Sequence, residues 1–387
     1  MIISKKPVVL ILFSVLIYST AGMALIYYLP RYLIFLGFNL ALTQLVTTIY
    51  PFSAIFLPQI FGQLSDKIQN RYLFIAIGSI GTSILLFLLI FSSNLILITT
   101  ILIFYSICNI SYRLNFTLYQ ELTKSNPKFV TFYNAISVFG WFLGSQLGGI
   151  FIDMYGISQI FFFILIISLI NLIIILFIRE NRGFILEHYN TVEKTDQLIN
   201  SINEEDPLIS KSIYVALFSR HLGVRPIITI LAVLMSFHLN SDTQIGFLLG
   251  FNPLLQFFLM LLTGKMITKE NEKYIMMIGF FLSAIAIFGY MLATDFLGYL
   301  FSQIMVSSSF ALFWNATQIY IAQKTNPNNK GKYLGYANSA FFSGGFIGGL
   351  FFSLLLSFNQ DYYAFMWIMM IFPLISTLAI FLKFKNK

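Results

Sequence analysis

The stretch GQLSDKIQNR, residues 62–71, gathers an aspartate, a lysine and an arginine in a chain that carries few charges. Charged residues make up 10% of the 387 residues, and long apolar runs lie on both sides of this stretch. Lysine and arginine at the end of an apolar run are typical of a short loop that joins two membrane-spanning helices. We therefore expect residues 62–71 to join two spans.

The composition indicates a membrane protein. Hydrophobic residues account for 58% of the chain, aromatic residues for 18%, and the mean hydropathy is +0.83. Soluble domains contain roughly 45–50% apolar residues. A lipid environment offers the backbone no hydrogen-bond partners, so the spans should be helical.

Runs long enough to cross a bilayer need roughly 20 apolar residues each. We predict an all-α integral membrane protein with twelve spans in two six-helix bundles. The spans are 8–29, 41–61, 72–92, 95–120, 130–153, 157–178, 212–237, 243–263, 274–293, 296–320, 333–357 and 362–382.

The distribution of basic residues predicts the orientation. With the N-terminus inside, 19 of the 23 lysines and arginines fall on the cytoplasmic side, which places both termini in the cytoplasm. The net charge of +8 is then an orientation signal, and we expect no nucleic-acid partner. The single cysteine, Cys108, gives neither a disulfide framework nor a metal cluster, and no cofactor is expected.

A polar stretch divides the spans six and six. Residues 179–211 hold seven of the chain's 15 acidic residues and are predicted to be a cytoplasmic linker between bundles at 1–178 and 212–387. The two bundles are also related in sequence, since NFTLYQELTKSNP ending at Pro127 aligns with NATQIYIAQKTNP ending at Pro327. Such duplication is typical of secondary transporters.

The opening stretch fits the signature G-x-L-x-D-[RK]-x-G-[RK]-[RK] through Gly62, Leu64, Asp66, Lys67 and Arg71. It thereby resembles the major facilitator superfamily, whose members carry this signature between spans two and three. A degenerate copy in that family lies between spans eight and nine, where this chain has GKMITKENEK from residue 264. The chain departs from the signature at residues 69, 70 and 268. With its twelve spans and central loop, the resemblance covers essentially the whole chain.

The resemblance implies a transporter that works by alternating access, in which the charged cluster holds the cytoplasmic side closed while the cavity faces outward. Glu121 resembles the acid that pairs with the arginine of the signature. The residues expected to act in gating are Gly62, Asp66, Lys67, Arg71, Glu121, Gly264 and Lys269. In span five, Gly140, Gly144 and Gly148 have the spacing that allows close helix packing.

Ionisable residues inside spans are the candidates for substrate binding. In span seven, His221 and Arg225 fall on one helical stripe, and Arg220 is expected either to join them or to extend toward the cytoplasmic interface. His221 is also a candidate proton carrier. In spans four and one, Arg113, Asn109 and Tyr18 complete the predicted site.

Basic residues without mid-membrane carboxylates favour a small organic anion as substrate. The alternatives are a promiscuous efflux carrier for hydrophobic compounds and, in another class, a membrane sensor or scaffold that transports nothing. No catalytic set is visible, so an enzyme is not expected. We expect a monomer, multi-pass in the plasma membrane, whose partners are its substrate, the surrounding lipid and either a coupling ion or none.

Overall fold

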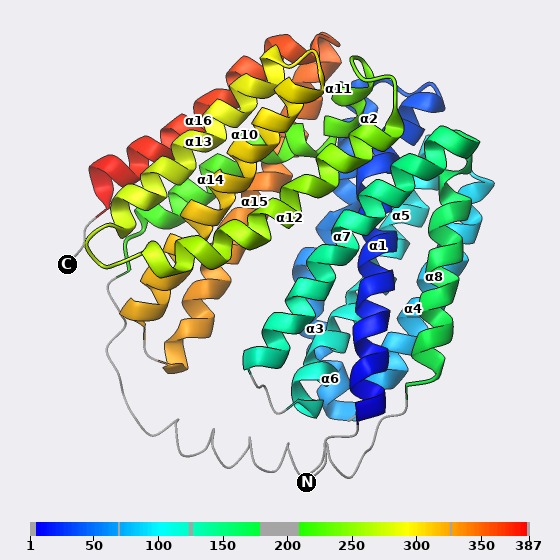
Figure 1. Cartoon of the computed structure of the whole chain (residues 1–387). Helices are drawn as coiled ribbons and strands as arrows, with labels where there is room; N and C mark the ends of the chain where they lie inside the picture. Colours follow the sequence, from blue (N-terminus) through cyan, green and yellow to red (C-terminus); the bar gives the residue numbers. More distant parts are fainter. Residues whose placement is uncertain (1–4, 69, 124–126, 179–208, 326, 385–387) are drawn as a thin grey trace. The chain divides into compact units, whose positions relative to one another are not determined.

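The structure is a computed structural model that describes residues 5–68, 70–123, 127–178, 209–325 and 327–384 (Figure 1). Every regular element in these ranges is an α-helix or a short 3₁₀ turn, so the all-α prediction is confirmed for them. Most of the predicted linker at 179–211 lies outside the described residues.

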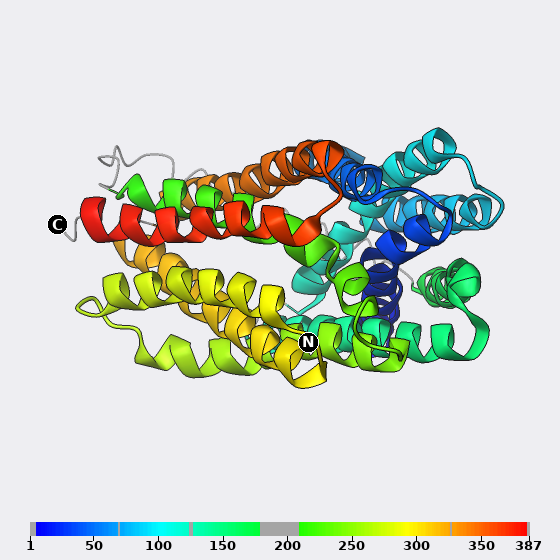
Figure 2. The same cartoon turned by 90° about the horizontal axis from the view of Figure 1, so that it is seen from above.

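The helices group into two packing units, each visible in Figures 1 and 2. The first comprises Met1–Leu25 and Ile49–Glu204, and the second comprises Ile26–Thr48 and Glu205–Lys387. The sequence repeat assigns residues 26–48 to the first half, whereas packing assigns them to the second unit.

The first unit begins with the start of α1 (Lys5–Phe35), which continues into the second unit. Its other elements are η1 (Tyr50–Phe52), α3 (Ser53–Ile68), α4 (Arg71–Ile90), α5 (Leu95–Ile110), η2 (Ser111–Arg113), α6 (Leu114–Leu122), α7 (Pro127–Tyr155), η3 (Ile157–Gln159) and α8 (Ile160–Leu176).

The second unit contains the end of α1 and, further along the chain, two short and six longer helices. They are α2 (Leu40–Ile49), α10 (Ser212–Thr229), α11 (Leu231–Ser236), α12 (Asp242–Met266), α13 (Glu272–Leu292), α14 (Phe296–Lys324), α15 (Pro327–Phe358) and α16 (Tyr362–Lys383). Side-chain caps begin several helices in both units, because Asn70, Asn94, Ser241, Asp295 and Asp361 each accept from the first turn.

Ten helices of the described chain are long and apolar enough to cross a membrane. The predicted spans 41–61 and 212–237 are not among them, and each is divided into two helices. The first break is the 3₁₀ turn that contains Pro51, and the second, at Ile230, follows Pro226 by one turn. Proline removes a backbone donor, which favours such interruptions.

Glycines bring helices together in the same way in both units. A Cβ at Gly144 of α7 would overlap the carbonyl oxygen of Thr20 on α1, and a Cβ at Gly344 of α15 would overlap that of Phe218 on α10. Only hydrogen at these positions allows backbones to approach so closely. The close approach predicted for the span-five glycines is therefore confirmed at Gly144, and its repeat at Gly344 has the same contact.

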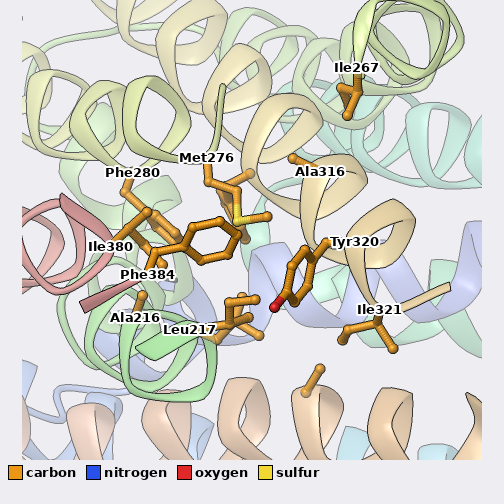
Figure 3. Packing of buried hydrophobic residues seen from close by; sticks show 13 residues of the cluster. Ala216, Leu217, Ile267, Met276, Phe280, Ala316, Tyr320, Ile321, Ile380 and Phe384 are labelled. Atoms are coloured by element: carbon orange, nitrogen blue, oxygen red, sulfur yellow. The ribbon is translucent and has the colours of Figure 1, made fainter. Parts of the chain in front are cut away.

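A buried apolar cluster holds α10, α13, α14 and α16 together in the second unit (Figure 3). Phe280 of α13 stacks on Phe313 of α14 with ring centroids 4.9 Å apart. Leu217 of α10 and Ile380 of α16 close the cluster from the other side, and both are fully buried. This packing fixes the buried face of α10, on which Arg220 lies.

We predict that Gly144→Ala and Gly344→Ala each destabilise the protein by about 1–3 kcal/mol, since the added methyl group must push two backbones apart. Gly22→Ala is the matched control, because a Cβ at Gly22 meets nothing within 4 Å. The measurement is the melting temperature in detergent. A Gly22 variant that melts as low as the other two would contradict the packing argument.

Candidate functional site

Arg220 is buried in α10, where it is 2% exposed. Its Nε donates to the Ser283 hydroxyl of α13 at 3.0 Å, and one terminal nitrogen lies 3.0 Å from Nε2 of His221. The guanidinium carbon also lies 4.8 Å from the centroid of the Phe313 ring, a cation–π contact. Extension of Arg220 to the cytoplasmic interface, one of the two expected placements, does not occur, because these contacts hold its side chain inside the unit.

His221 is neutral in this arrangement. Since a guanidinium can only donate, Nε2 of His221 must accept from Arg220, and its proton lies on Nδ1. That nitrogen donates to the Leu217 carbonyl oxygen at 3.2 Å. The ring also packs against Phe341, with centroids 3.2 Å apart. His221 therefore positions Arg220 while remaining uncharged.

Arg225 contrasts with Arg220, because its side chain is exposed although it lies within predicted span seven. Its Cγ would lie 3.0 Å from a Cβ at Gly345 of α15, so this glycine makes room for the arginine stem. Tyr27 of α1 is close enough for electrostatic interaction with Arg225, and its hydroxyl donates to the Leu249 carbonyl oxygen at 3.3 Å.

Positive charge accumulates around these two arginines. Arg220 and Arg225 lie close enough to repel one another. No carboxylate of the described residues forms a salt bridge with either. The hydroxyl of Tyr290, which lies near Arg220, is buried without a hydrogen-bond partner in the described chain. A bound anion would supply the countercharge that this part of the second unit lacks.

The first unit places Tyr18, Asn109 and Arg113 near one another. Tyr18 of α1 lies beside Asn109 and Arg113 and stacks on Tyr112, with ring centroids 3.4 Å apart and planes 15° apart. Arg113 is exposed at the end of the 3₁₀ turn that interrupts span four. This unit therefore has its own exposed mid-span arginine next to an aromatic pair.

A cavity of uncharged polar groups lies next to this aromatic pair. Its lining includes Tyr18, Ser79, Thr82, Asn109 and Asn171. Behind it, the Ser14 hydroxyl lies 2.8 Å from the Tyr112 hydroxyl and donates to Asn171 Oδ1 at 2.8 Å. Within the described residues, Ser79 Oγ and Asn109 Oδ1 have no hydrogen-bond partner. These two buried atoms remain available to a buried water molecule.

Two of the predicted gating residues, Arg71 and Glu121, form a buried ion pair. Together with Ser65, which also contacts Arg71, they form a cluster that we call the inner latch. Arg71 Nε donates to Glu121 Oε1 at 2.8 Å, and a terminal nitrogen approaches the same oxygen at 2.7 Å. The other terminal nitrogen donates to Ser65 Oγ at 3.1 Å. Arg71 is 6% and Glu121 5% exposed, so the latch joins α4 to α3 and α6 away from water.

The other predicted gating residues are placed differently. Lys67 is exposed on α3, and the side chain of Asp66 lies outside the described part of the chain. In the second unit, Glu272 is 1% exposed at the start of α13, where Lys324 and Lys269 are near enough to stabilise its charge. Gly264 lies in α12, near Asn315 of α14.

Sequence reasoning missed one ion pair at the predicted outer side, between Arg31 of α1 and Asp242 of α12. A signal for it was present in the sequence, because Arg31 follows the first predicted span, 8–29, and so falls on the outer side of the predicted orientation, where few basic residues lie. Other contacts attach the same segment to the second unit. Ser353 of α15 donates to the Ala41 carbonyl oxygen at 2.7 Å, and a Cβ at Gly349 would overlap the Thr48 side chain.

Known proteins share this architecture. Residues 213–387 match the family described as Major Facilitator Superfamily. The nucleoside transporter NupG has a TM-score of 0.79 at 13% identity, covering 99% of this chain and 100% of its own. The inward-open xylose transporter XylE from E. coli has a TM-score of 0.70 at 15% identity, covering 99% of this chain and 97% of its own. Among curated proteins, none matches the sequence.

A POT family transporter is similar to the same extent. The POT family transporter PepTSo has a TM-score of 0.74 at 12% identity, covering 98% of this chain and 97% of its own. At such low identity these similarities establish the fold, and they do not transfer a substrate.

We predict that Arg71→Gln and Glu121→Gln each destabilise the protein by about 3–5 kcal/mol, because each leaves one buried charge unpaired. The double variant should lose less unfolding free energy than the two single variants lose together, and the difference, the coupling energy, should be about 0.5–3 kcal/mol. Denaturant unfolding of all three variants provides the test, with exposed Lys67→Gln as control. Strictly additive losses would show that the two side chains do not act as a pair.

Proposed function

Because the chain belongs to the major facilitator superfamily, we propose that it is a secondary transporter that carries a small organic anion across a membrane by alternating access. Family and fold support transport of a small molecule by a multi-pass membrane protein. The choice of an anion is our own inference from the arginines. The same family assignment argues for a carrier rather than an enzyme.

The observation that supports an anionic substrate is the exposure of Arg113 and Arg225 within spans. A charged side chain at the bilayer centre costs about 2.5–3.5 kcal/mol on insertion scales. That cost is avoided if each guanidinium faces a water-filled cavity. Within the described residues neither arginine has a carboxylate partner. Both guanidinium groups are therefore free to bind a carboxylate or phosphate through two parallel hydrogen bonds.

The working cycle that we propose uses the repeated halves. The chain crosses the membrane twelve times, with the interrupted helices at 41–61 and 212–237 serving as the second and seventh spans and with both termini in the cytoplasm. The halves 1–178 and 212–387 rock about the substrate, as is general for transporters built from parallel repeats, and residues 26–48 move with the second half, against which they pack. The inner latch, whose residues all lie in the first unit, holds α3, α4 and α6 together while that half moves.

We predict that organic anions raise the melting temperature of the purified protein, since binding to the folded state stabilises it by about 2.7 kcal/mol at 100 times the Kd. Organic cations and neutral compounds of similar size should leave it unchanged. Arg225→Gln and Arg113→Gln should each abolish the shift. Lys383→Gln, which removes an exposed charge at the end of α16, should retain it.

Two outcomes would favour the alternatives. If bulky cations and neutral hydrophobic compounds stabilise the protein and both arginine variants equally, the arginines are structural and promiscuous efflux becomes the better hypothesis. If anions bind in the predicted way but proteoliposomes never accumulate a radiolabelled anion, the protein is a sensor rather than a carrier.

A further inference from the structure

Three aromatic side chains form a partly exposed cluster in the second unit, which we call the aromatic wall: Phe310 and Trp314 of α14 and Phe341 of α15. The Trp314 and Phe341 ring centroids are 5.2 Å apart, with an angle of 56° between the planes. Phe310 lies 5.9 Å from Trp314 and 6.1 Å from Phe341. Each ring therefore contacts both others, while part of each remains open.

The aromatic wall adjoins the arginines of α10. Phe341 packs on His221, which holds the guanidinium of Arg220. One helical turn further along α15, Gly345 faces the stem of Arg225. Successive turns of an α-helix are about 5.4 Å apart. An apolar ring surface and an exposed guanidinium thus lie roughly one turn apart along the α10 side of α15.

The depth of the aromatic wall distinguishes it from the usual membrane aromatics. Tryptophan in membrane proteins concentrates at the two interfaces, where its N–H reaches water or headgroups. Trp314 lies ten residues before Lys324, the last residue of α14, which corresponds to about 15 Å of helix. That depth is near the middle of a hydrocarbon core about 30 Å thick. An interfacial anchor is therefore a poor explanation for this residue.

We propose that the substrate is an aromatic organic anion, whose ring packs against Trp314 and Phe341 while its acidic group binds Arg225. This inference rests on the proposed function and narrows its substrate class. Offset or edge-to-face packing gives aromatic rings a preference over saturated rings of the same size. The acidic group supplies the countercharge that Arg225 and Arg220 lack among the described residues.

The test compares 3-phenylpropionate with 3-cyclohexylpropionate, which share the carboxylate and chain length and differ in the aromaticity of the ring. Titration calorimetry on the full-length protein should give a Kd about two- to tenfold lower for the phenyl compound. Trp314→Leu and Phe341→Leu should each bring the ratio of the cyclohexyl Kd to the phenyl Kd close to one. Both substitutions should leave the Kd of the cyclohexyl compound nearly unchanged. Trp367→Leu, which changes an exposed tryptophan on α16, is the matched control and should retain the wild-type ratio.

The outcomes separate this inference from the function on which it rests. If both compounds bind with equal Kd and Arg225→Gln abolishes the binding of both, the protein takes organic anions but has no aromatic preference. In that case the inference fails and the proposed function stands. If neither compound binds, or if Arg225→Gln changes neither Kd, both the inference and the anion assignment fail. The wild-type ratio decides the matter even if a wall variant does not fold.

Discussion

The free-energy cost of removing a guanidinium from water governs how this protein is organised. The structure meets that cost in three ways. Arg71 and Arg31 pair with carboxylates, and Arg220 is held by a hydroxyl, an imidazole and an aromatic face. Arg113 and Arg225 have no such partner in the described residues and remain exposed. The last pair carries the unused hydrogen-bonding capacity, and a substrate site is expected where such capacity remains.

Duplication preserved backbone contacts more faithfully than charges. The Gly144 contact with Thr20 recurs as the Gly344 contact with Phe218, atom for atom. The charges are reversed between the units. In the inner latch, the arginine lies at the start of α4 and the glutamate lies on α6. In the second unit, the acidic residue Glu272 lies at the start of α13 and the basic residue Lys324 lies at the end of α14. Close packing tolerates only glycine, while a charge pair works with either sign at either end.

The sequence predicted much of the fold and less of the site. Hydrophobic run lengths and glycine spacing are local properties, so they located most helices and the Gly144 packing contact. Pro51 and Pro226 mark where the breaks at residues 50–52 and 230 can form, but whether a helix breaks there depends on how neighbouring helices replace the lost backbone bonds, which is not a local property. Helical periodicity placed His221 and Arg225 on one stripe but could not identify Ser283, 63 residues away from Arg220, as the group that keeps Arg220 buried. The aromatic wall was missed for the same reason, since its rings come from two helices.

The grouping of residues 26–48 with the second unit has a consequence for biosynthesis. These residues are among the first to leave the ribosome, yet the residues they contact, Asp242, Leu249 and Ser353, are made some 200 or more positions later. The nascent chain must therefore hold this segment in the membrane without its final neighbours while most of the polypeptide is synthesised. The two halves therefore cannot fold independently, because residues 26–48 reach their final packing only after the second half has been synthesised.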